Sequence, residues 1–474
     1  MHSSQPAPNG DGTDEVLILG AGPAGLATAL FAARRGMRVS VIERGAAVGG
    51  LTRSETIDGV RVDLGSHRLH PAAPAPVLKT LTELLGDDLQ LRPRNGRVRI
   101  AERWVGFPLR PAELARRMPL RWLLAAAREA VHNPDRGVAG SSYEAALRSS
   151  LGPTAYESIY GPFARKLWGL PGDEIDAEQA RVRVTADSAI KVVARMVRRA
   201  QFFYPRKGYG QICEELTAAA ERAGAQICLD SEVVEIVPGH PVTVRSRDGR
   251  CWQAARVLST LPIPVLARTV TPSPPDLVVA QARGLRMRAM LLVYLTHRPA
   301  LGTVAVPVRW TPYDAHYLPS LRSPVSRISE PANYRDSADD PVDRSVVCAE
   351  IPCTVGDDLW SSPDEALAAA VTDTLSAHNL PPIAVDGVQV RRVPAVYPVY
   401  DHGFAQRLQC VEDWAEQLTG VTTFGRAGLF AHDNTHHALV MAQAAAVCLG
   451  PGGAFDEAAW GRARESFRGH VVED

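Results

Sequence analysis

The stretch HDNTHH (residues 432–437) gathers three histidines beside an aspartate and an asparagine, directly before an apolar run. Residues of these types bind transition metals, act as acids and bases, or begin helices. Asn434 is a favoured N-cap, so we expect a helix to begin near Thr435. His432 then precedes the cap and does not share a helix face with His436, as a zinc pair would. No cysteine or second histidine group elsewhere supplies an obvious fourth ligand, so the sequence predicts no metal site.

A second set of residues suits the binding of a dinucleotide. Gly20, Gly22 and Gly25 form GxGxxG directly after the apolar run VLIL, and Glu43 ends a later run, RVSVIE. Such glycines permit a tight turn, let the backbone approach a pyrophosphate and allow a helix to pack closely on a strand. The helix N-terminus favours phosphate, and the acidic residue accepts hydrogen bonds from ribose. We predict a dinucleotide site; the alternative is a tight turn that binds nothing.

The next segment indicates that this dinucleotide is FAD. Gly49, Gly50 and Leu51 form a second glycine turn soon after the acidic residue, and two such turns suit one extended cofactor. VRVDLGSH then alternates like a strand and runs into Gly65 and Ser66. Small residues there let a flat ring lie against the backbone. No second GxGxxG follows a strand, so the sequence gives no evidence for a separate NAD(P)H domain.

Length and composition describe the class of protein that carries these residues. The chain has 474 residues, of which 46% are hydrophobic and 22% charged, with a formal net charge of +0. These values are typical of a globular protein with more than one structural unit and indicate no nucleic-acid partner. The seven cysteines form no CxxC, which fits a reducing cytoplasm. No apolar run is long enough for a transmembrane segment, and a monotopic membrane contact stays open.

The motifs quoted above resemble one superfamily of flavoproteins. The segments GAGPAGLATA, VIERGAAVGGLTRS and DGVRVDLGSH are similar to the start of amine oxidases, protoporphyrinogen oxidases, carotenoid-type desaturases and UDP-galactopyranose mutases. YGPFARKLWGLP, FFYPRKGYGQICEEL and the final Gly-Arg and Asn-x-x-His pattern are most similar to the mutases. The resemblance implies an α/β fold in which a discontinuous Rossmann-type FAD-binding domain carries a helical insertion and a mixed-sheet substrate domain.

The order of these segments implies the domain boundaries. We expect a disordered leader, three parts of an FAD-binding domain, two inserted regions and a C-terminal helix and tail. The leader covers residues 1–13, the FAD-binding parts 14–95, 205–268 and 420–450, the helical insertion 96–204, the sheet-containing substrate region 269–419, and the tail 451–474.

The resemblance also implies which residues hold a non-covalent FAD. They are the two glycine turns and their neighbours, the turn after VRVD, two later strand ends and the start of the last long helix. In this sequence they are Gly20, Gly22, Ala24, Gly25, Glu43, Arg44, Gly49, Gly50, Leu51, Gly65, Ser66, His67, Val233, Thr260, Gly425, Arg426, Asn434, Thr435 and Ala438.

The mutase-like segments imply a substrate site built from arginine and tyrosine. Its residues are Arg183, Tyr317, Arg327, Tyr334, Tyr397, His432 and Asn434. Arg183, Arg327, His432 and His67 are the candidates for catalysis. Arginine and tyrosine suit a diphosphate because both donate hydrogen bonds to phosphate oxygens. The alternatives are a solvated helix face for Arg183, a surface ion pair for Arg327, core tyrosines, and a turn histidine at residue 67.

The chain also departs from the mutase pattern. His432 stands where the mutases carry a tyrosine, Ala315 where an aromatic residue stacks near the base, and Ser66 where they carry a glycine. Two functions therefore stay open: a redox-neutral mutase that acts on a nucleotide-linked sugar through reduced flavin, and an FAD-dependent oxidoreductase of the amine oxidase, desaturase or dehydrogenase type. A non-catalytic FAD scaffold is a third. We expect a small-molecule substrate, with an external reductant or NAD(P)H as a further partner, and leave the oligomeric state open.

Overall fold

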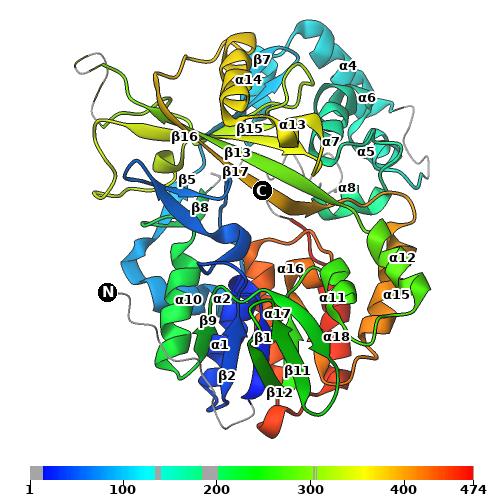
Figure 1. Ribbon diagram of the computed structural model, residues 1–474. Helices are drawn as coiled ribbons and strands as arrows, with labels where there is room; N and C mark the ends of the chain where they lie inside the picture. The colour runs from blue at the N-terminus through cyan, green and yellow to red at the C-terminus, as the bar shows by residue number, and fades with distance from the viewer. Residues whose placement is uncertain are drawn as a thin grey trace.

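The structure is a computed structural model that describes residues 14–133, 140–183, 201–300, 302, 305 and 307–472. The predicted leader lies outside these residues, as do Arg195, Arg198 and Arg199, which follow Arg183 in the sequence. Figure 1 shows two lobes, with β1 and α1 in the lower lobe and the long strands β13, β16 and β17 in the upper lobe. The predicted α/β fold with mixed sheets is confirmed.

A seven-stranded sheet forms the centre of the lower lobe, in the order β10-β11-β12-β1-β2-β9, with β18 also paired to β12. β1 is parallel to β2 and β12, and Ile18 lies opposite Val41 and Leu258. Continuous apolar runs form the central strands because helices cover both faces. The strands are β1 (Asp14–Leu19), β2 (Val39–Ile42), β9 (Gln226–Cys228), β10 (Val233–Val237), β11 (Val242–Ser246), β12 (Cys251–Ser259) and β18 (Val421–Thr423).

Helix α1 (Pro23–Ala33) is the centre of the lower-lobe core. Its alanines and leucines are buried on every side because the helix packs on α10 and α17 as well as on the sheet. The other helices of this lobe are α2 (Ala75–Leu85), α10 (Gln211–Arg222), α11 (Ile263–Thr269), α12 (Asp276–Gly284), α15 (Phe404–Ala415), α16 (Gly425–Gly428), α17 (Thr435–Cys448) and α18 (Glu457–Phe467).

A second seven-stranded sheet, in the order β17-β13-β16-β15-β14-β6-β7, forms the upper lobe. α14 (Asp364–Ala377) covers one face of β13 and β16, and the hairpin of β3 (Ser54–Ile57) and β4 (Val60–Asp63) packs on the other. The strands are β6 (Gly96–Ile100), β7 (Arg103–Phe107), β13 (Met287–His297), β14 (Ala315–Tyr317), β15 (Arg327–Ser329), β16 (Ser345–Cys353) and β17 (Val385–Pro398). β5 (Leu89–Pro93) pairs with β8 (Gln201–Pro205) between the lobes.

The range 96–204, expected to be mainly helical, begins with β6 and β7. Val98 and Ile100 alternate with arginines and are buried, which is the period of a strand, and β6 pairs with the distant β14. The helices that follow are α3 (Pro111–Arg117), α4 (Leu120–Val131), α5 (Tyr143–Leu151), α6 (Pro153–Ala155), the π-helix η3 (Tyr156–Tyr160), α7 (Gly161–Trp168) and α8 (Ala177–Arg183).

The remaining elements are short. They are α13 (Asp358–Ser361) and the single turns η1 (Gly50–Thr52), η2 (Gly86–Asp88), η4 (Pro331–Asn333) and η5 (Pro451–Gly453). Among the described residues, the longest apolar helices all fall short of the length that crosses a bilayer.

Candidate flavin and substrate site

The first glycine turn has the packing that the sequence predicts. Gly20 has φ +103°, and a Cβ on it would lie 2.2 Å from Thr260 Oγ1. A Cβ on Gly25 would lie 2.0 Å from the carbonyl oxygen of Gly20, whereas a Cβ on Gly22 would meet nothing within 4 Å. Gly20 and Gly25 are therefore needed for close packing, and Gly22 leaves the backbone open at the N-terminus of α1, where a phosphate is favoured.

The second glycine turn converges on the first. Gly49 has φ +110°, and its N–H donates to Ala21 O at 2.8 Å. A Cβ on Gly50 would lie 3.5 Å from the Cα of Gly22. Glu43 holds the two loops together, because its carboxylate accepts from the N–H groups of Ala21 and Gly45, both at 2.9 Å. Leu51 follows in η1, and Arg44 is exposed beside Glu43.

Residues distant in sequence close the other side of this cradle. Thr260 Oγ1 donates to Leu19 O at 2.7 Å. Gly425 has φ +76°, and a Cβ on it would lie 3.2 Å from the Cβ of Ala24. The N–H of Ser231 donates to Glu43 O at 2.8 Å, which brings the start of β10, and with it Val233, next to the acidic residue.

The last predicted part of the cradle is the N-terminus of α17. Asn434 is the N-cap in a capping box with His437, and Thr435 and Ala438 follow in the first turn. α17 packs on α1, so the first turns of both helices belong to one site. A narrow glycine-lined backbone cradle with two helix N-termini fits the pyrophosphate of FAD, which supplies the redox-active flavin ring when it is bound.

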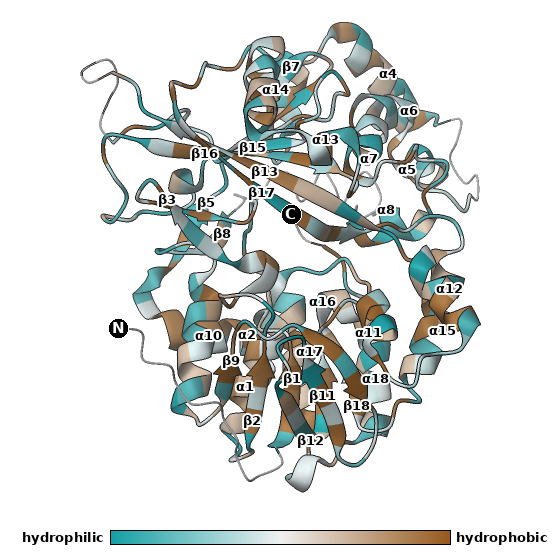
Figure 2. Cartoon of the chain, viewed as in Figure 1, coloured by the Kyte–Doolittle hydropathy of each residue, from teal (hydrophilic) through white to brown (hydrophobic). Residues whose placement is uncertain are grey.

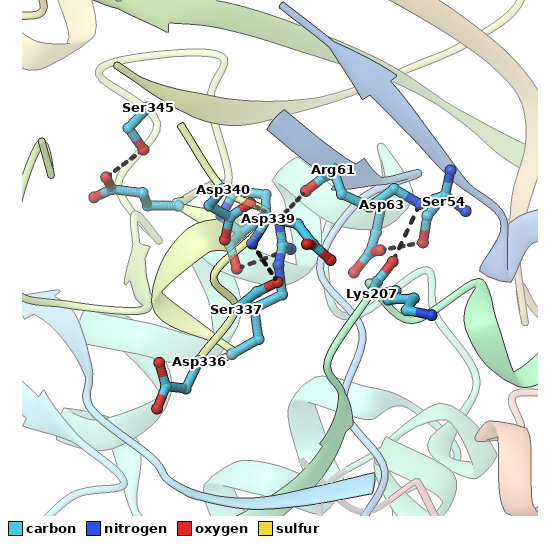
Figure 3. Close-up of polar contacts among 12 residues, drawn as sticks. Ser54, Arg61, Asp63, Lys207, Asp336, Ser337, Asp339, Asp340 and Ser345 are labelled. Carbon is cyan, nitrogen blue, oxygen red and sulfur yellow. Dashed lines mark hydrogen bonds and ion pairs between the residues drawn. The ribbon is translucent and has the colours of Figure 1, made fainter. Parts of the chain in front are cut away.

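Asp63 fixes the turn that carries Gly65, Ser66 and His67. This buried carboxylate accepts from Ser54 Oγ at 2.6 Å, from the N–H of Tyr209 at 2.9 Å and from the hydroxyl of Tyr204. Figure 3 shows Ser54 and Asp63 pointing toward each other beside Lys207. The network joins β4 to the segment that returns the chain to the lower lobe.

His67 lies on this turn and stacks on Tyr209, with ring centroids 5.2 Å apart. Its Nε2 is 3.0 Å from Leu64 O, so the ring carries its proton on that nitrogen. Burial lowers the pKa of His67, which keeps the imidazole neutral near neutral pH.

Arg327 is neutralised by a partner that the sequence motifs did not indicate. Its Nε and Nη2 donate to the two carboxylate oxygens of Glu350 at 2.9 and 2.8 Å. The same carboxylate accepts from the N–H of Ser66 at 2.9 Å, and Ser66 Oγ is 2.5 Å from the hydroxyl of Tyr334. The predicted substrate residues Arg327 and Tyr334 are thus brought together with the predicted flavin residue Ser66.

Arg68 is a further arginine of this site, and sequence reasoning missed it. Its guanidinium lies 3.3 Å from Asp314 Oδ1 and donates to the hydroxyls of Tyr317 and Tyr334 at 3.2 and 3.4 Å. It also lies over the ring of Tyr334, 4.9 Å from the centroid. Arg327 lies over the ring of Tyr317 at 5.7 Å, so both arginines line one tyrosine-rich wall.

Arg183 and Arg426 both lie against the ring of Tyr397, and neither forms an ion pair with the described residues. Their guanidinium carbons are 5.2 and 5.7 Å from the centroid of the Tyr397 ring. Arg426 Nη2 donates to Val396 O at 2.9 Å, so this predicted cofactor residue turns toward the substrate residues. Burial, and to a smaller extent Arg183, lowers the pKa of Arg426, whereas Tyr397, Asp433 and Tyr400 act in the opposite direction.

His432 completes this part of the site. Its ring stacks with Tyr397 at 6.3 Å, and its Nε2 is 3.1 Å from the amide oxygen of Gln179. Burial first, and then Arg183 and Arg426, lower the pKa of His432 well below its usual value. The imidazole is therefore neutral, and Gln179 is the hydrogen-bond acceptor that orients it.

The cluster next to His432 bears on the prediction that no metal is bound. Asp433, His437 and His470 bring ligand atoms within 4.8 Å of one another, and the sequence analysis did not pair His470 with the motif. His470 and His437 both place Nδ1 near Asp433 Oδ1, at 3.0 and 3.2 Å. The rings of His437 and His470 stack on each other, at an interplanar angle of 13° and with centroids 4.1 Å apart. His437 Nδ1 also accepts a hydrogen bond from the N–H of Asn434. This favours a structural role for the cluster, in which its hydrogen bonds hold the start of α17.

The residues that sequence reasoning missed share one property. Each of them acts through partners in distant segments, which the sequence does not show. Only Arg68 could have been noticed, because it directly follows the predicted site residue His67. The missed residues are Asp63, Arg68, Gln179, Tyr204, Tyr209, Asp314 and Glu350.

Comparisons with known proteins agree with this geometry. Residues 23–402 match the family model of flavin containing amine oxidoreductases. No curated protein matches the sequence. A structure of reduced UDP-galactopyranose mutase is similar over 97% of this chain and all of its own, with TM-score 0.80 and 19% identity.

Two further solved structures share the fold. Wild-type putrescine oxidase bound to putrescine is 18% identical, with TM-score 0.61, over 92% of this chain and 98% of its own. An oxidoreductase from Methanosarcina mazei is 16% identical, with TM-score 0.62, over 90% of this chain and 99% of its own. The family model covers most of the sequence, and FAD is the cofactor that the glycine cradle fits. The chain therefore belongs to the FAD-dependent flavin containing amine oxidoreductases.

Proposed function

We propose that this flavoenzyme interconverts the pyranose and furanose forms of a nucleotide-linked sugar, with no net redox change. The observation that carries the proposal is the pair Arg183 and Arg426, which both contact Tyr397 and have no carboxylate partner among the described residues. Two guanidinium groups that have no carboxylate partner in the described chain favour an anionic ligand, and a diphosphate offers enough oxygens for both. Reduced FAD supplies the nucleophile in this chemistry.

The residues of the chain then have separate tasks. Arg183, Arg426 and the hydroxyl of Tyr397 stabilise the charge that grows on the diphosphate as its bond to the sugar breaks. Ser66, held by Glu350 and Tyr334, lines the flavin side of the site. The neutral imidazole of His432 adds no positive charge and lies within reach of the same ligand as Tyr397.

The charge of the site distinguishes this proposal from amine oxidation. Arg68 and Arg327 are paired with Asp314 and Glu350, whereas Arg183 and Arg426 are not. Two of these four arginines therefore have no carboxylate partner, which disfavours a protonated amine next to them.

The second candidate is an FAD-dependent oxidoreductase that acts on an anionic biosynthetic intermediate. The family match favours it. The oxidoreductase would use the same anion site as the mutase. The two candidates differ only in whether the substrate is oxidised.

One experiment separates the two candidates. Enzyme reduced with dithionite under anaerobic conditions is incubated with a panel of UDP- and dTDP-linked hexopyranoses, and the products are identified by proton NMR. We expect a furanose product, tighter binding to reduced than to oxidised enzyme, and no oxygen consumption when air is admitted with substrate. Peroxide production in step with substrate loss would instead establish the oxidoreductase.

A further inference from the structure

Helix α4 (Leu120–Val131) has an apolar face that the described chain leaves uncovered. Leu120, Leu124 and Val131 are 70%, 62% and 84% exposed. Their spacing of four and seven residues places them on one side of the helix. Trp122 and Leu123, which lie outside this exposed stripe, pack on the cluster of Val98, Ile100, Val105 and Met118. The helix is thus anchored by one apolar face and presents a second.

The surroundings of this face are positively charged. Arg116, Arg121 and Arg128 are exposed on α3 and α4 and form no ion pair with the described residues. The acidic residues of α3 and α4 themselves, Glu113 and Glu129, are already engaged. Glu113 accepts from the N–H of Gly106 and pairs with Arg117, and Glu129 accepts from the N–H and hydroxyl of Thr154. We define the α4 surface as Leu120, Leu124 and Val131 with Arg116, Arg121 and Arg128.

Figure 1 shows α4 at the outer edge of the upper lobe, at the top right, away from the lower lobe. In Figure 2 both hydrophobic and hydrophilic residues are found along it. A helix that mixes exposed leucine and valine with arginine and lies at the edge of a molecule has the character of an interfacial helix.

We propose that the α4 surface docks on a membrane that contains anionic lipids, with the leucines and Val131 in the headgroup region and the arginines on lipid phosphates. Charge complementarity selects this occupant. In a symmetric contact between two copies the same patch faces itself, so Arg121 and Arg128 would meet arginines, and neither acidic residue of α3 and α4 is free to pair with them. An anionic lipid surface satisfies both the charge and the apolar side chains. The proposal is independent of the reaction.

The test is sedimentation of the flavin-loaded protein with vesicles of phosphatidylcholine, with and without phosphatidylglycerol. We expect the protein to pellet only with phosphatidylglycerol and to be released by high salt, because exposed charges are screened. Leu120→Ser with Leu124→Ser, and separately Arg121→Glu with Arg128→Glu, are expected to weaken binding about tenfold or more. All variants should keep their flavin absorbance, since these side chains lie outside the core.

Two control variants change residues of the same types elsewhere. Leu277→Ser alters a leucine of α12 that is 63% exposed, and Arg222→Glu alters an exposed arginine of α10 in the lower lobe. Both controls should sediment like the original protein. The proposal is overturned if phosphatidylglycerol vesicles carry no protein, or if the α4 variants bind as well as the controls. A dimer in analytical ultracentrifugation that Leu124→Ser dissociates would assign the surface to a second copy and would also overturn it.

Discussion

Arg183 and Arg327 were both expected to bind a diphosphate, and their surroundings separate their roles. Arg327 already donates two hydrogen bonds to Glu350, so it offers a ligand only the outer edge of its guanidinium. Arg183 has an aromatic neighbour, Tyr397, and no carboxylate partner in the described chain. The free charge for an anion therefore comes mainly from Arg183 and Arg426.

Substitution of Arg183 by glutamine should weaken the binding of UDP without unfolding the protein. A charge-assisted hydrogen bond contributes about 1.5–3 kcal/mol, or roughly 10- to 100-fold in affinity. Isothermal titration of UDP measures this loss. Arg181→Gln is the matched control, because Arg181 lies on the same helix and is paired with Glu178. Equal affinities of the two variants would contradict the anion role of Arg183.

Substitution of Arg327 by methionine should lower stability more than the double change Arg327→Met with Glu350→Leu. The single variant leaves a buried carboxylate without its cation, which typically costs about 3–5 kcal/mol, whereas removal of both charges is closer to neutral. Chemical denaturation of the two single variants and the double variant gives the coupling energy. If the effects of the single changes simply add, the pair is not coupled.

At the residue scale, the sequence predicted the arginines and tyrosines of the site but not the carboxylates that pair with them. Arg327, Tyr334 and Ser66 meet through Glu350, on a strand whose apolar sequence gave no reason to expect a charge. Asp63 is likewise a strand residue whose three donors come from two other segments. A carboxylate shows such a role only when its distant partners are known.

At the scale of elements, local patterns were sufficient for the β1–α1–β2 unit and insufficient for β6 and β7. The first unit is specified by a continuous run, three glycines and an acid that lie close together in sequence. β6 pairs with β7 across the turn at Ala101 and Glu102, and with the distant β14. This short alternating pattern was overlooked because the range around it is rich in helix formers.

Gly25 lies where α1 packs closely on the end of β1, so the position does not accommodate a larger residue without a shift of the helix. Gly25→Ala places a Cβ 2.0 Å from the carbonyl oxygen of Gly20, so α1 must move and the phosphate cradle widens. We expect purified Gly25→Ala to contain little flavin by its absorbance spectrum. Gly461→Ala, at a helical glycine with nothing within 4 Å, is the control and should keep its full flavin content. Normal flavin content in Gly25→Ala would show that the cradle tolerates this shift.

At the scale of the whole molecule, a single lysine joins the helices of the upper lobe to its sheet. Lys166 of α7 is buried, and its Nζ donates to Leu318 O and Val325 O at 2.7 and 2.8 Å. Both carbonyls belong to the connection between β14 and β15. Burial lowers the pKa of Lys166 to about 7, and a neutral amine still has two hydrogens for the two carbonyls.

This lysine should make stability rise with pH. Above the folded pKa, the unfolded state binds more protons at Lys166 than the folded state does, so the free energy of unfolding increases with pH. Between pH 7 and 8 we expect a gain of about 1 kcal/mol relative to Lys166→Met. Urea denaturation at both pH values measures it, with the exposed Lys79→Met as the control. If Lys166→Met keeps the same pH dependence as Lys79→Met, the gain does not come from Lys166.

The sheet of the lower lobe has a consequence for how the protein is made. β1 is the first described element, but β18 joins β12 and α17 packs on α1 only after residues 421–448 have been synthesised. During translation the nascent chain exposes an unfinished sheet while the entire upper lobe emerges. FAD therefore binds to a complete site only after nearly the whole chain has left the ribosome. A protein truncated by a stop codon before residue 421 would lack bound flavin, and hence colour, and would be degraded by proteases.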